Sequence, residues 1–381
     1  MLGPVPKYRV RYVPPQEKDI HPMRPYRPNL SALEEALLSS KRPRIAVMGD
    51  FCLDKYLYID AALDEPSVET GLTAYQVRRK ALYPGAAGTI ANNLAALGAE
   101  LFCFGLCGDD GEGYELRRCL HAIGADTDGL LCADGLFTAT YTKPMRQSEG
   151  VWKELNRLDM RTGKAAPRPA VEQVLSALKR VVDSGTLDAV VISDQFTLEA
   201  GSVLSPATRA AVSDLAGRHP EIFFLADSRS YAGEYRQMMI KCNASELLDL
   251  AGRRRDGGAA RVAADPSADS RQRELLAAGA HLAAQNGRDV LVTRGKAGSF
   301  LFSEGTVTAI EPFEVTGPID ICGAGDATDT AFVLGVALGL PRPDAALLAA
   351  AVSSITIQQI GVIGTATRKE ALERIASKYP R

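Results

Sequence analysis

A short run near the carboxyl end of the chain combines a carboxylate with three small residues. Gly323, Ala324 and Gly325 are followed by Asp326, and an apolar stretch of helical character comes after it. Glycine lets backbone amides approach a ligand closely, and the first amides of a helix have no partner within the helix, so such a helix start binds anions. Bound phosphate would repel a nearby carboxylate unless that carboxylate takes part in the reaction. The spacing therefore indicates phosphoryl transfer, with Asp326 accepting the proton of the attacking hydroxyl. The alternative is that Asp326 only caps the helix.

Further carboxylates stand at or just after the ends of apolar runs. Residues 44–49 have the composition of a buried parallel strand, Asp50 follows them directly, and Asp54 lies four residues on. A parallel strand delivers the residue after it to the carboxyl edge of its sheet, where ligands bind in open α/β folds. Two carboxylates there either bind sugar hydroxyls or cap a turn. Asp194 ends a later apolar run, and the same two interpretations apply to it.

Alternating helix and strand patterns indicate the elements that must position these side chains. We expect helices over residues 169–183 and 205–217, strands over 189–193 and 222–226, and another helix near 231–239. Strands separated by helices of this length form parallel βαβ units with right-handed connections. The pattern predicts an α/β fold with a doubly wound, mostly parallel sheet and helices on both faces.

Other stretches of the chain break this alternation. Short alternating pieces over about 55–83 and β-type residues over 137–160 predict strands of a separate small sheet. Residues 1–40 are predicted to be an N-terminal extension, because the prolines among its first 30 residues suit neither a helix nor an inner strand. This arm wraps the domain, pairs with another subunit or is a loosely ordered tail. Residues 41–381 are expected to form the main domain.

Composition favours a small-molecule partner. The 381 residues are 46% hydrophobic and 24% charged, which allows a large core, and the net charge of -2 gives no general attraction to nucleic acid or to a membrane surface. The seven cysteines form no Cys-x-x-Cys pair, which indicates reduced thiols. The chain has no apolar run of membrane-spanning length and no apolar signal segment at its start. We expect a cytoplasmic protein.

The run over residues 320–326 resembles the Asp-x-Thr-Gly-Ala-Gly-Asp signature of the ribokinase-like (pfkB) carbohydrate kinases, and the resemblance covers residues 41 to about 375. It implies a ribokinase-like fold and ATP-dependent transfer of the γ-phosphoryl group to a sugar hydroxyl. In the family the last Asp is the catalytic base and the preceding amides form the anion hole. These roles fall here on Asp326 and on Gly323, Ala324 and Gly325. Cys322 stands where the family usually has Thr.

The resemblance also implies sugar-binding residues. It assigns Asp50 and Asp54 to substrate hydroxyls, and it places a polar substrate residue near Asp194. Residues 84–93 resemble the family's Gly-Gly-Ala-Ala-Asn motif and the Asn-containing helix after it. The corresponding binding positions here are Gly85, Thr89 and Asn93, although Ala86 replaces the second Gly and Thr89 replaces the Asn. A plain helix start explains these residues equally well.

The small sheet resembles the lid of this family, and its second half is similar to that of the D-glycero-D-manno-heptose-7-phosphate kinases. Lys143, Arg146 and Arg157, with Arg78 and Arg79, are then expected to cradle a phosphate already present on the sugar. The alternative is a solvated basic strand face. In the family such a lid often joins two subunits, which implies a homodimer.

The resemblance also implies where ATP and its metal ion bind, through two further motifs. Asn243 and Glu246 match Asn-x-x-Glu, and they lie one helical turn apart, where both can order the water shell of Mg²⁺. Residues 293–298 resemble the family's nucleotide loop, which assigns Thr293, Arg294, Gly295 and Gly298 to ATP; a hairpin turn fits the same residues. Residues 361–366 are expected near the adenine or a monovalent cation. Asp329, one turn after the predicted base, is interpreted as a solvated neighbour rather than a substrate contact.

Alternative functions remain at this point. The first is a kinase for a neutral sugar or a nucleoside. The second is a catalytically silent sugar-binding or regulatory homologue, which the departures from the family pattern at Ala86, Thr89, Cys322 and Asp329 keep open.

Overall fold

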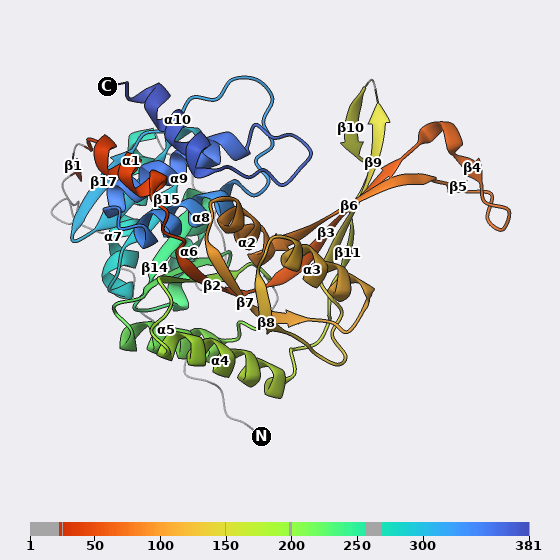
Figure 1. The fold of residues 1–381 in the computed structure, drawn as a ribbon, viewed down its shortest axis with the longest axis horizontal. Helices are drawn as coiled ribbons and strands as arrows, with labels where there is room; N and C mark the ends of the chain where they lie inside the picture. The colour runs from red at the N-terminus through yellow and green to blue at the C-terminus, as the bar shows by residue number, and fades with distance from the viewer. Residues whose placement is uncertain (1–22, 25, 149, 198–199, 257–267, 381) are drawn as a thin grey trace.

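A ten-stranded sheet between two layers of helices forms the main body, and a smaller sheet projects from it (Figure 1). The structure is a computed structural model and describes residues 23–24, 26–148, 150–197, 200–256 and 268–380. Most of the predicted proline-rich extension therefore lies outside the described residues. In spatial order the strands of the main sheet are β1 (Met23–Arg24), β17 (Thr306–Ile310), β16 (Ser299–Ser303), β15 (Val290–Thr293), β14 (Met239–Asn243), β13 (Phe223–Ser228), β12 (Ala189–Asp194), β2 (Arg44–Gly49), β7 (Glu100–Cys107) and β8 (Asp126–Cys132).

The strand directions make this sheet doubly wound. Every neighbouring pair is parallel except the two pairs that contain β16, which runs against the others. From β2 the chain builds outward through β7 and β8, and it then returns to add β12 on the other side of β2. The carboxyl ends of β2 and β12 therefore border the point where the winding reverses, and in open α/β sheets ligands bind at such a point.

Burial on both faces explains why the main strands read as continuous apolar runs. In β2, Ile45 and Val47 face one hydrophobic core, whereas Ala46 and Met48 face the other. The first core is covered by α1 (Leu30–Leu38), α2 (Ala87–Ala96), α3 (Gly111–Ala122), α8 (Ala324–Ala337), α9 (Arg342–Thr356) and α10 (Arg368–Lys378). The second core is covered by α4 (Arg168–Asp183), α5 (Pro206–Arg218), α6 (Ala244–Asp256) and α7 (Ala268–Asn286).

The second sheet, which we call the lid, begins one residue after β2. Its strand order is β10-β9-β3-β6, with β11 paired to β9, and a short β4–β5 hairpin extends from it. Only Asp50 separates β2 from β3, so the lid is anchored at the carboxyl end of the main sheet. Figure 1 shows these strands reaching away from the body on the right. The lid strands are β3 (Phe51–Ile59), β4 (Glu65–Pro66), β5 (Thr73–Ala74), β6 (Val77–Ala86), β9 (Thr140–Ser148), β10 (Val151–Glu154) and β11 (Leu158–Met160).

The predicted fold class is confirmed, and one predicted helix is wrong. Where a helix was expected near residues 231–239, the chain forms the 3₁₀ turn η3 (Ala232–Glu234) and then enters β14. Gln237 has a positive φ of 61°, which no helix accommodates, and Tyr235 is fully buried with its hydroxyl on Asp194. Among the described residues, no helix combines the length and apolarity needed to cross a membrane.

Candidate active site

A cleft of about 1090 Å³ lies at the carboxyl ends of the main strands, between the start of α8 and the lid. It collects residues that are more than 270 positions apart in the chain. The predicted site residues that line it are Asp54, Thr89, Lys143, Arg157, Asn243, Glu246, Thr293, Gly295, Gly298, Gly323, Ala324, Gly325 and Asp326.

The start of α8 forms the floor of the cleft. Its N-cap is Gly323, which has a left-handed φ of 76°, and no side chain caps the helix. The Ala324 amide donates to the Ile321 carbonyl at 3.2 Å, whereas the amides of Gly325 and Asp326 are left without a helical or side-chain partner, as an anion site requires. Asp326 lies in the first turn of the helix and not at the N-cap position, so the capping interpretation of Asp326 is wrong.

Asp326 has the electrostatics of a base that works near neutral pH. Burial raises the pKa of its carboxyl, Lys241 and Arg229 act to lower it, and nearby Asp227 acts to raise it; together they set a pKa of about 7. A carboxyl with an ordinary pKa near 4 would be ionised but a weak proton acceptor. A pKa close to neutrality makes Asp326 a better match for general base catalysis.

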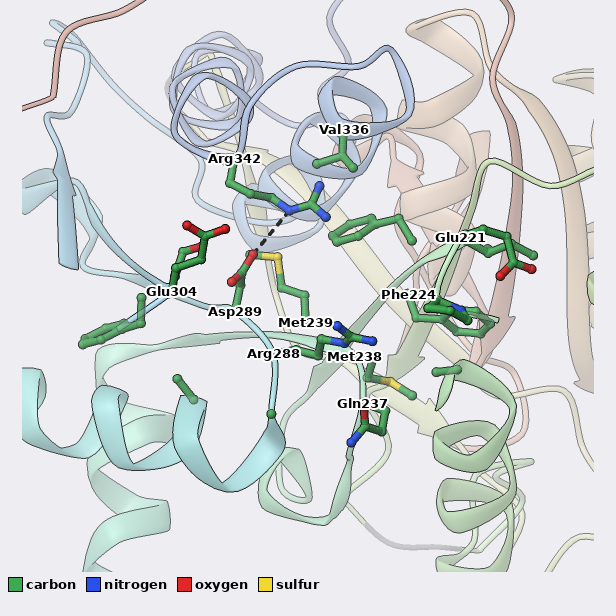
Figure 2. Close-up of a pocket in the computed structure, with 18 of the residues that line it drawn as sticks. Glu221, Phe224, Gln237, Met238, Met239, Arg288, Asp289, Glu304, Val336 and Arg342 are labelled. Carbon is green, nitrogen blue, oxygen red and sulfur yellow. Dashed lines mark ion pairs between the residues drawn. The ribbon is translucent and has the colours of Figure 1, made fainter. Parts of the chain in front are cut away.

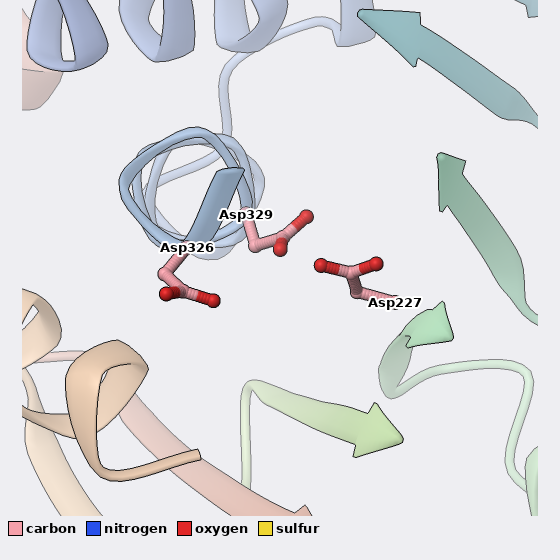
Figure 3. A group of neighbouring side chains, drawn as sticks. All are labelled: Asp227, Asp326 and Asp329. Atoms are coloured by element: carbon pink, nitrogen blue, oxygen red, sulfur yellow. The ribbon is translucent and has the colours of Figure 1, made fainter. Parts of the chain in front are cut away.

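A cluster of buried charges lies beside the base. Asp227, Asp326 and Asp329 bring carboxylate oxygens within 4.8 Å of one another, and Figure 3 shows Asp326 and Asp329 projecting from α8, with the Asp329 carboxyl facing Asp227. The Lys241 ammonium lies 2.8 Å from Asp227 and 3.2 Å from Asp329. Asp329 is fully buried, so its interpretation as a solvated neighbour is wrong. Burial acts to lower the pKa of Lys241, but Asp227 and Asp329 together hold it above its usual value.

The wall on the lid side carries a buried lysine. The Lys143 ammonium lies 3.4 Å from Asp54 and donates a hydrogen bond of 2.9 Å to the Tyr56 hydroxyl. Burial raises the pKa of Asp54, and Lys143 opposes that shift. Gly85 does not line the cleft, but a Cβ there would lie 2.6 Å from an Asp54 oxygen. Glycine at this position thus lets β6 pack against the carboxylate.

Two arginines flank one aspartate on the same wall. Arg157 and Arg161 line the cleft, both contact Asp159, at 2.6 and 3.3 Å, and both lie about 5 Å from the Tyr141 ring. Two guanidinium groups share one carboxylate, so Arg157, Arg161 and Asp159 together carry a net positive charge. Arg161 and Tyr141 were not predicted from the sequence. Positions 157, 159 and 161 alternate across β11 and the residue on either side of it, and this spacing of two is the signal that could have indicated a shared face.

The opposite end of the cleft suits a nucleotide. Asn243 Oδ1 accepts from the Glu246 amide at 2.9 Å, and a Glu246 oxygen accepts from the Asn243 amide at 2.8 Å, so the two side chains are fixed at the start of α6. Gly298 has φ 79° and its Cβ would lie 2.1 Å from the Ile310 carbonyl oxygen, so only glycine fits this turn. Apolar residues line the same end, among them Phe313, Val315, Ala346, Ala350, Ile357 and Ile363.

The donor set at this end fits a magnesium ion held through water. Asn243 and Glu246 offer oxygen ligands, which Mg²⁺ prefers, and each side chain keeps acceptor capacity beyond its bond to the helix amide. The carboxylate cluster at Asp227 and Asp329 fits less well, because the Lys241 ammonium already lies between those two groups.

Asp50 does not line the cleft, and its predicted contact with substrate hydroxyls is not supported by its position. Its carboxylate is 2% exposed and accepts hydrogen bonds from the amides of Gln195 and Phe196 and from the Ser202 hydroxyl, at 2.9, 2.7 and 2.6 Å. These bonds tie β2 to the loop that follows β12. Burial raises the pKa of Asp50 to about 7, while these hydrogen bonds lower it.

Four other predicted site residues also lie outside the cleft lining. Asp194 is fully buried and pairs with Arg209 at 2.9 Å. Asn93 is buried in α2, and its amide donates to the Thr89 carbonyl. Arg146 pairs with Asp64. The fourth is Arg294, which packs over the Phe300 ring and bonds to the Ala297 carbonyl.

A second cavity, of about 960 Å³, lies at the opposite edge of the main sheet (Figure 2). It is lined by residues at the amino ends of the strands, such as Met239 and Asp289, and Asp289 forms an ion pair with Arg342 at 3.3 Å. Catalytic groups of open α/β sheets gather at the carboxyl ends of strands, so this cavity is not the candidate active site.

Comparison with known proteins assigns the family. The model of the pfkB family carbohydrate kinases matches residues 44–369. The chain belongs to the pfkB family of carbohydrate kinases. The predicted resemblance is thereby confirmed, and so is the enzyme class, a phosphotransferase with an alcohol group as acceptor.

Curated relatives of this family member include bifunctional proteins. The chain is 30% identical over 325 residues to the bifunctional protein HldE of Citrifermentans bemidjiense, which covers 85% of this chain and 61% of that protein. It is 29% identical to the bifunctional protein HldE of Caulobacter sp. strain K31, over 83% of this chain and 60% of that protein. The kinase therefore spans about three fifths of the length of these relatives.

Solved structures agree on the fold. Ribokinase of Arabidopsis thaliana, complexed with ribose and ATP, has a TM-score of 0.62 at 18% identity and covers 88% of this chain and 99% of its own. Phosphofructokinase-2 of Escherichia coli, in complex with potassium, has a TM-score of 0.66 at 16% identity, with coverage of 88% and 99%. The ribokinase-like fold of this pfkB kinase is thus confirmed.

Proposed function

We propose that this carbohydrate kinase uses ATP to phosphorylate a sugar that already carries a phosphate, with a heptose 7-phosphate, phosphorylated at the anomeric position, as the first candidate. The observation that carries the proposal is the positive group of Arg157 and Arg161 on the same cleft as Asp326. Guanidinium groups bind phosphate through paired hydrogen bonds, and a neutral sugar offers no charge to match them. The likeness to the HldE proteins supports the heptose.

The remaining residues of the cleft take roles that follow from their positions. Asp54 and Thr89 are proposed to bind sugar hydroxyls between the lid and α8, with Lys143 holding Asp54 in place. Thr293, Gly295 and Gly298 are proposed to contact ATP, whose adenine then lies in the apolar end of the cleft. The complexes of ribokinases with ATP and with ADP support nucleotide binding on this fold.

In the proposed reaction Asp326 takes the proton of the attacking sugar hydroxyl, and the amides at the start of α8 stabilise charge on the transferred phosphoryl group. A bound Mg²⁺ held through water by Asn243 and Glu246 would neutralise charge on the ATP phosphates. Alignment of hydroxyl, phosphorus and leaving group supplies the rest of the rate enhancement. A monovalent cation is also proposed near residues 361–366, and replacing potassium by sodium in the assay tests it.

The experiment that tests the substrate class is a screen of sugars and sugar phosphates with ATP, read as ADP release and product mass. We expect turnover with phosphorylated sugars and little with their unphosphorylated counterparts. Efficient turnover of ribose, fructose or a nucleoside, with no gain from a sugar phosphate, would favour the neutral-sugar alternative. Sugar binding by calorimetry without any ADP release would select the catalytically silent homologue.

The arginine pair gives a sharper test. Arg157→Ala and Arg161→Ala are each expected to raise the KM for the sugar phosphate about 10- to 100-fold, because each removes a charged contact to the phosphate. The matched control is Arg118→Ala on α3, which removes an exposed arginine paired with Glu115 and should leave KM unchanged. If Arg146→Ala raises the KM for the sugar phosphate and neither Arg157→Ala nor Arg161→Ala does, the phosphate lies farther out on the lid.

We also propose that the kinase is a homodimer joined through the lid, and that it works in the cytoplasm. Exposed apolar side chains gather on the lid, and such patches mark protein contacts. All seven cysteines are unpaired, which supports a reducing compartment. The exposed apolar residues of the lid are Leu63, Val68, Leu72, Tyr75, Val77, Trp152, Leu155 and Leu158.

A further inference from the structure

Asp329 is a fully buried carboxyl that neither the fold nor the proposed reaction has explained so far. It lies one helical turn after Asp326 on α8 and shares its side of the helix, but it is buried behind the cleft lining. By strict hydrogen-bond geometry neither of its oxygens has a partner among the described residues, although the Asp227 carboxyl lies close enough to raise its pKa. A buried carboxyl left in this state costs stability, which indicates a role beyond packing. Its close charged neighbours are Lys241, at 3.2 Å, and the carboxyls of Asp227 and Asp326, whose oxygens lie within 4.8 Å.

The Lys241 ammonium lies directly beneath the glycine turn of the anion site. A Cβ added to Gly325 would lie 2.9 Å from its nitrogen, so the absence of a side chain at this position leaves room for the ammonium. The side chain of Lys241 is 5% exposed and lines the cleft. An ammonium has three N–H groups. Asp227 lies on one side of it at 2.8 Å, Asp329 on a second, and the start of α8 on the third.

We propose that Asp329 is a positioning residue for phosphoryl transfer: it holds the Lys241 ammonium against the start of α8, so that one N–H group points at the transferred phosphoryl group. Without this second contact the flexible lysine side chain would pivot about Asp227. A donor fixed before the reaction stabilises developing charge more than one that must reorient during it. This inference rests on the proposed function, and it names the group that orients the charge behind the anion site.

The charge balance of the cluster supports the same role. With Asp227, Asp326 and Asp329 all ionised, one lysine would leave a net charge of about -2 beside the incoming phosphate. Burial raises the pKa of Asp329 well above its usual value, and the Asp227 carboxyl adds to the shift, although Lys241 opposes it. Burial also acts to raise the pKa of Asp227, but Lys241 and Asp329 hold it below its usual value. A neutral Asp329 still offers a carbonyl oxygen to the ammonium, and it adds no repulsion.

The test compares Asp329→Asn with Asp329→Leu. The Asn variant keeps a neutral side chain with a carbonyl oxygen, and we expect it to retain at least a third of the wild-type kcat. The Leu variant removes that oxygen, and we expect kcat to fall about 10- to 100-fold with the sugar KM unchanged. If the Leu variant does not fold, Asp329→Ala takes its place. The matched control is Asp344→Asn, a buried carboxyl on α9 outside the cleft, which should leave kcat unchanged.

A double variant separates positioning from a general structural effect. If Asp329 acts through the lysine, Asp329→Leu should cause no further loss of kcat once Lys241→Met is present. An equal loss in both backgrounds, or a Leu variant as active as wild type, would overturn the proposal. Calorimetry with a non-hydrolysable ATP analogue gives a readout without turnover, and we expect about 10-fold weaker binding for Asp329→Leu. A wild-type protein that binds this analogue but transfers no phosphate would contradict the proposed function. The comparison of analogue binding between wild type and Asp329→Leu would still test the role of Asp329.

Discussion

At the residue scale, Ala86 shows how a departure from the family pattern appears as backbone strain. It lies at the N-cap of α2 with φ 52° and ψ -117°, a conformation that glycine adopts readily and other residues rarely do. The family motif has glycine at this position, so the sequence shows that the residue departs from the pattern. Only the backbone angles show that the alanine is strained. The chain keeps this conformation because the Ala87 amide is bonded to the Asp50 carbonyl at 2.9 Å.

Relief of this strain is measurable. Ala86→Gly is expected to raise the free energy of unfolding by about 1 kcal/mol, because the left-handed conformation no longer places a Cβ against the backbone. Chemical denaturation measures the change. The control is Ala87→Gly, the first residue inside α2, which should lower the free energy of unfolding by about 1 kcal/mol. A destabilised Ala86→Gly variant would show that the alanine methyl contributes packing that outweighs the strain.

The pKa of Asp326 sets a second prediction at this scale. A base with a pKa of about 7 must be ionised to work, so kcat/KM should rise with pH through about 7 and then level off. Asp326→Asn should lose about 10²- to 10⁴-fold in kcat and should show no such limb in its residual activity. A wild-type profile that is flat from pH 5 to 8, or near-normal turnover by the Asn variant, would remove Asp326 from the role of base.

The same shift predicts a pH-dependent difference in stability. The folded-state pKa is raised above the ordinary value of 3.8, so this carboxyl favours folding below pH 4 and that contribution is lost as the pH rises through about 7. The thermal midpoint of Asp326→Asn minus that of wild type should therefore grow between pH 4 and 8. Asp50 also titrates near 7, but it is present in both proteins and cancels in the difference.

At the scale of elements, the sequence predicted which edge of the sheet carries the site but not which side chains enter it. Asp50 follows β2 and Asp194 is the last residue of β12, yet both are buried and hold neighbouring segments together. A strand fixes the position of the residue that follows it, whereas the direction of that side chain depends on the next loop. Ser202 and Arg209, which bind these two carboxylates, come from loops and helices whose packing the pattern does not determine.

Motifs that carry their own local geometry were more informative. The glycine run and the helix after it fix the candidate anion site within a few residues, and Asn243 and Glu246 are fixed by one helical turn. Lys241 and Asp329 were not predicted to meet, because they belong to β14 and α8, which the chain brings together only when the sheet is complete. Contacts between residues so far apart in the sequence can be identified only from the structure.

At the scale of the whole molecule, the cleft has one rigid wall and one that depends on the lid. The start of α8 is packed into the main body, whereas Lys143, Arg157 and Arg161 stand on or beside lid strands that project from it (Figure 1). The lid core cluster is small, comprising Tyr56, Tyr58 and Met145 with two partly buried neighbours. A projecting sheet with so little core gains stability from a partner that covers its exposed apolar residues.

A charge placed on the lid hairpin tests this dependence. Val68 and Leu72, between β4 and β5, are 98% and 72% exposed, and the double substitution Val68→Asp and Leu72→Asp should convert a dimer into a monomer at micromolar concentration, as measured by light scattering. The control is Leu38→Asp on α1, which is 64% exposed but lies on the main body and should leave the dimer intact. Because the arginine wall stands on the lid, the monomer should also show a raised KM for the sugar phosphate with less change in kcat. A wild-type protein that is monomeric at these concentrations, or a charged variant that stays dimeric, would show that the exposed hairpin is not the dimer contact.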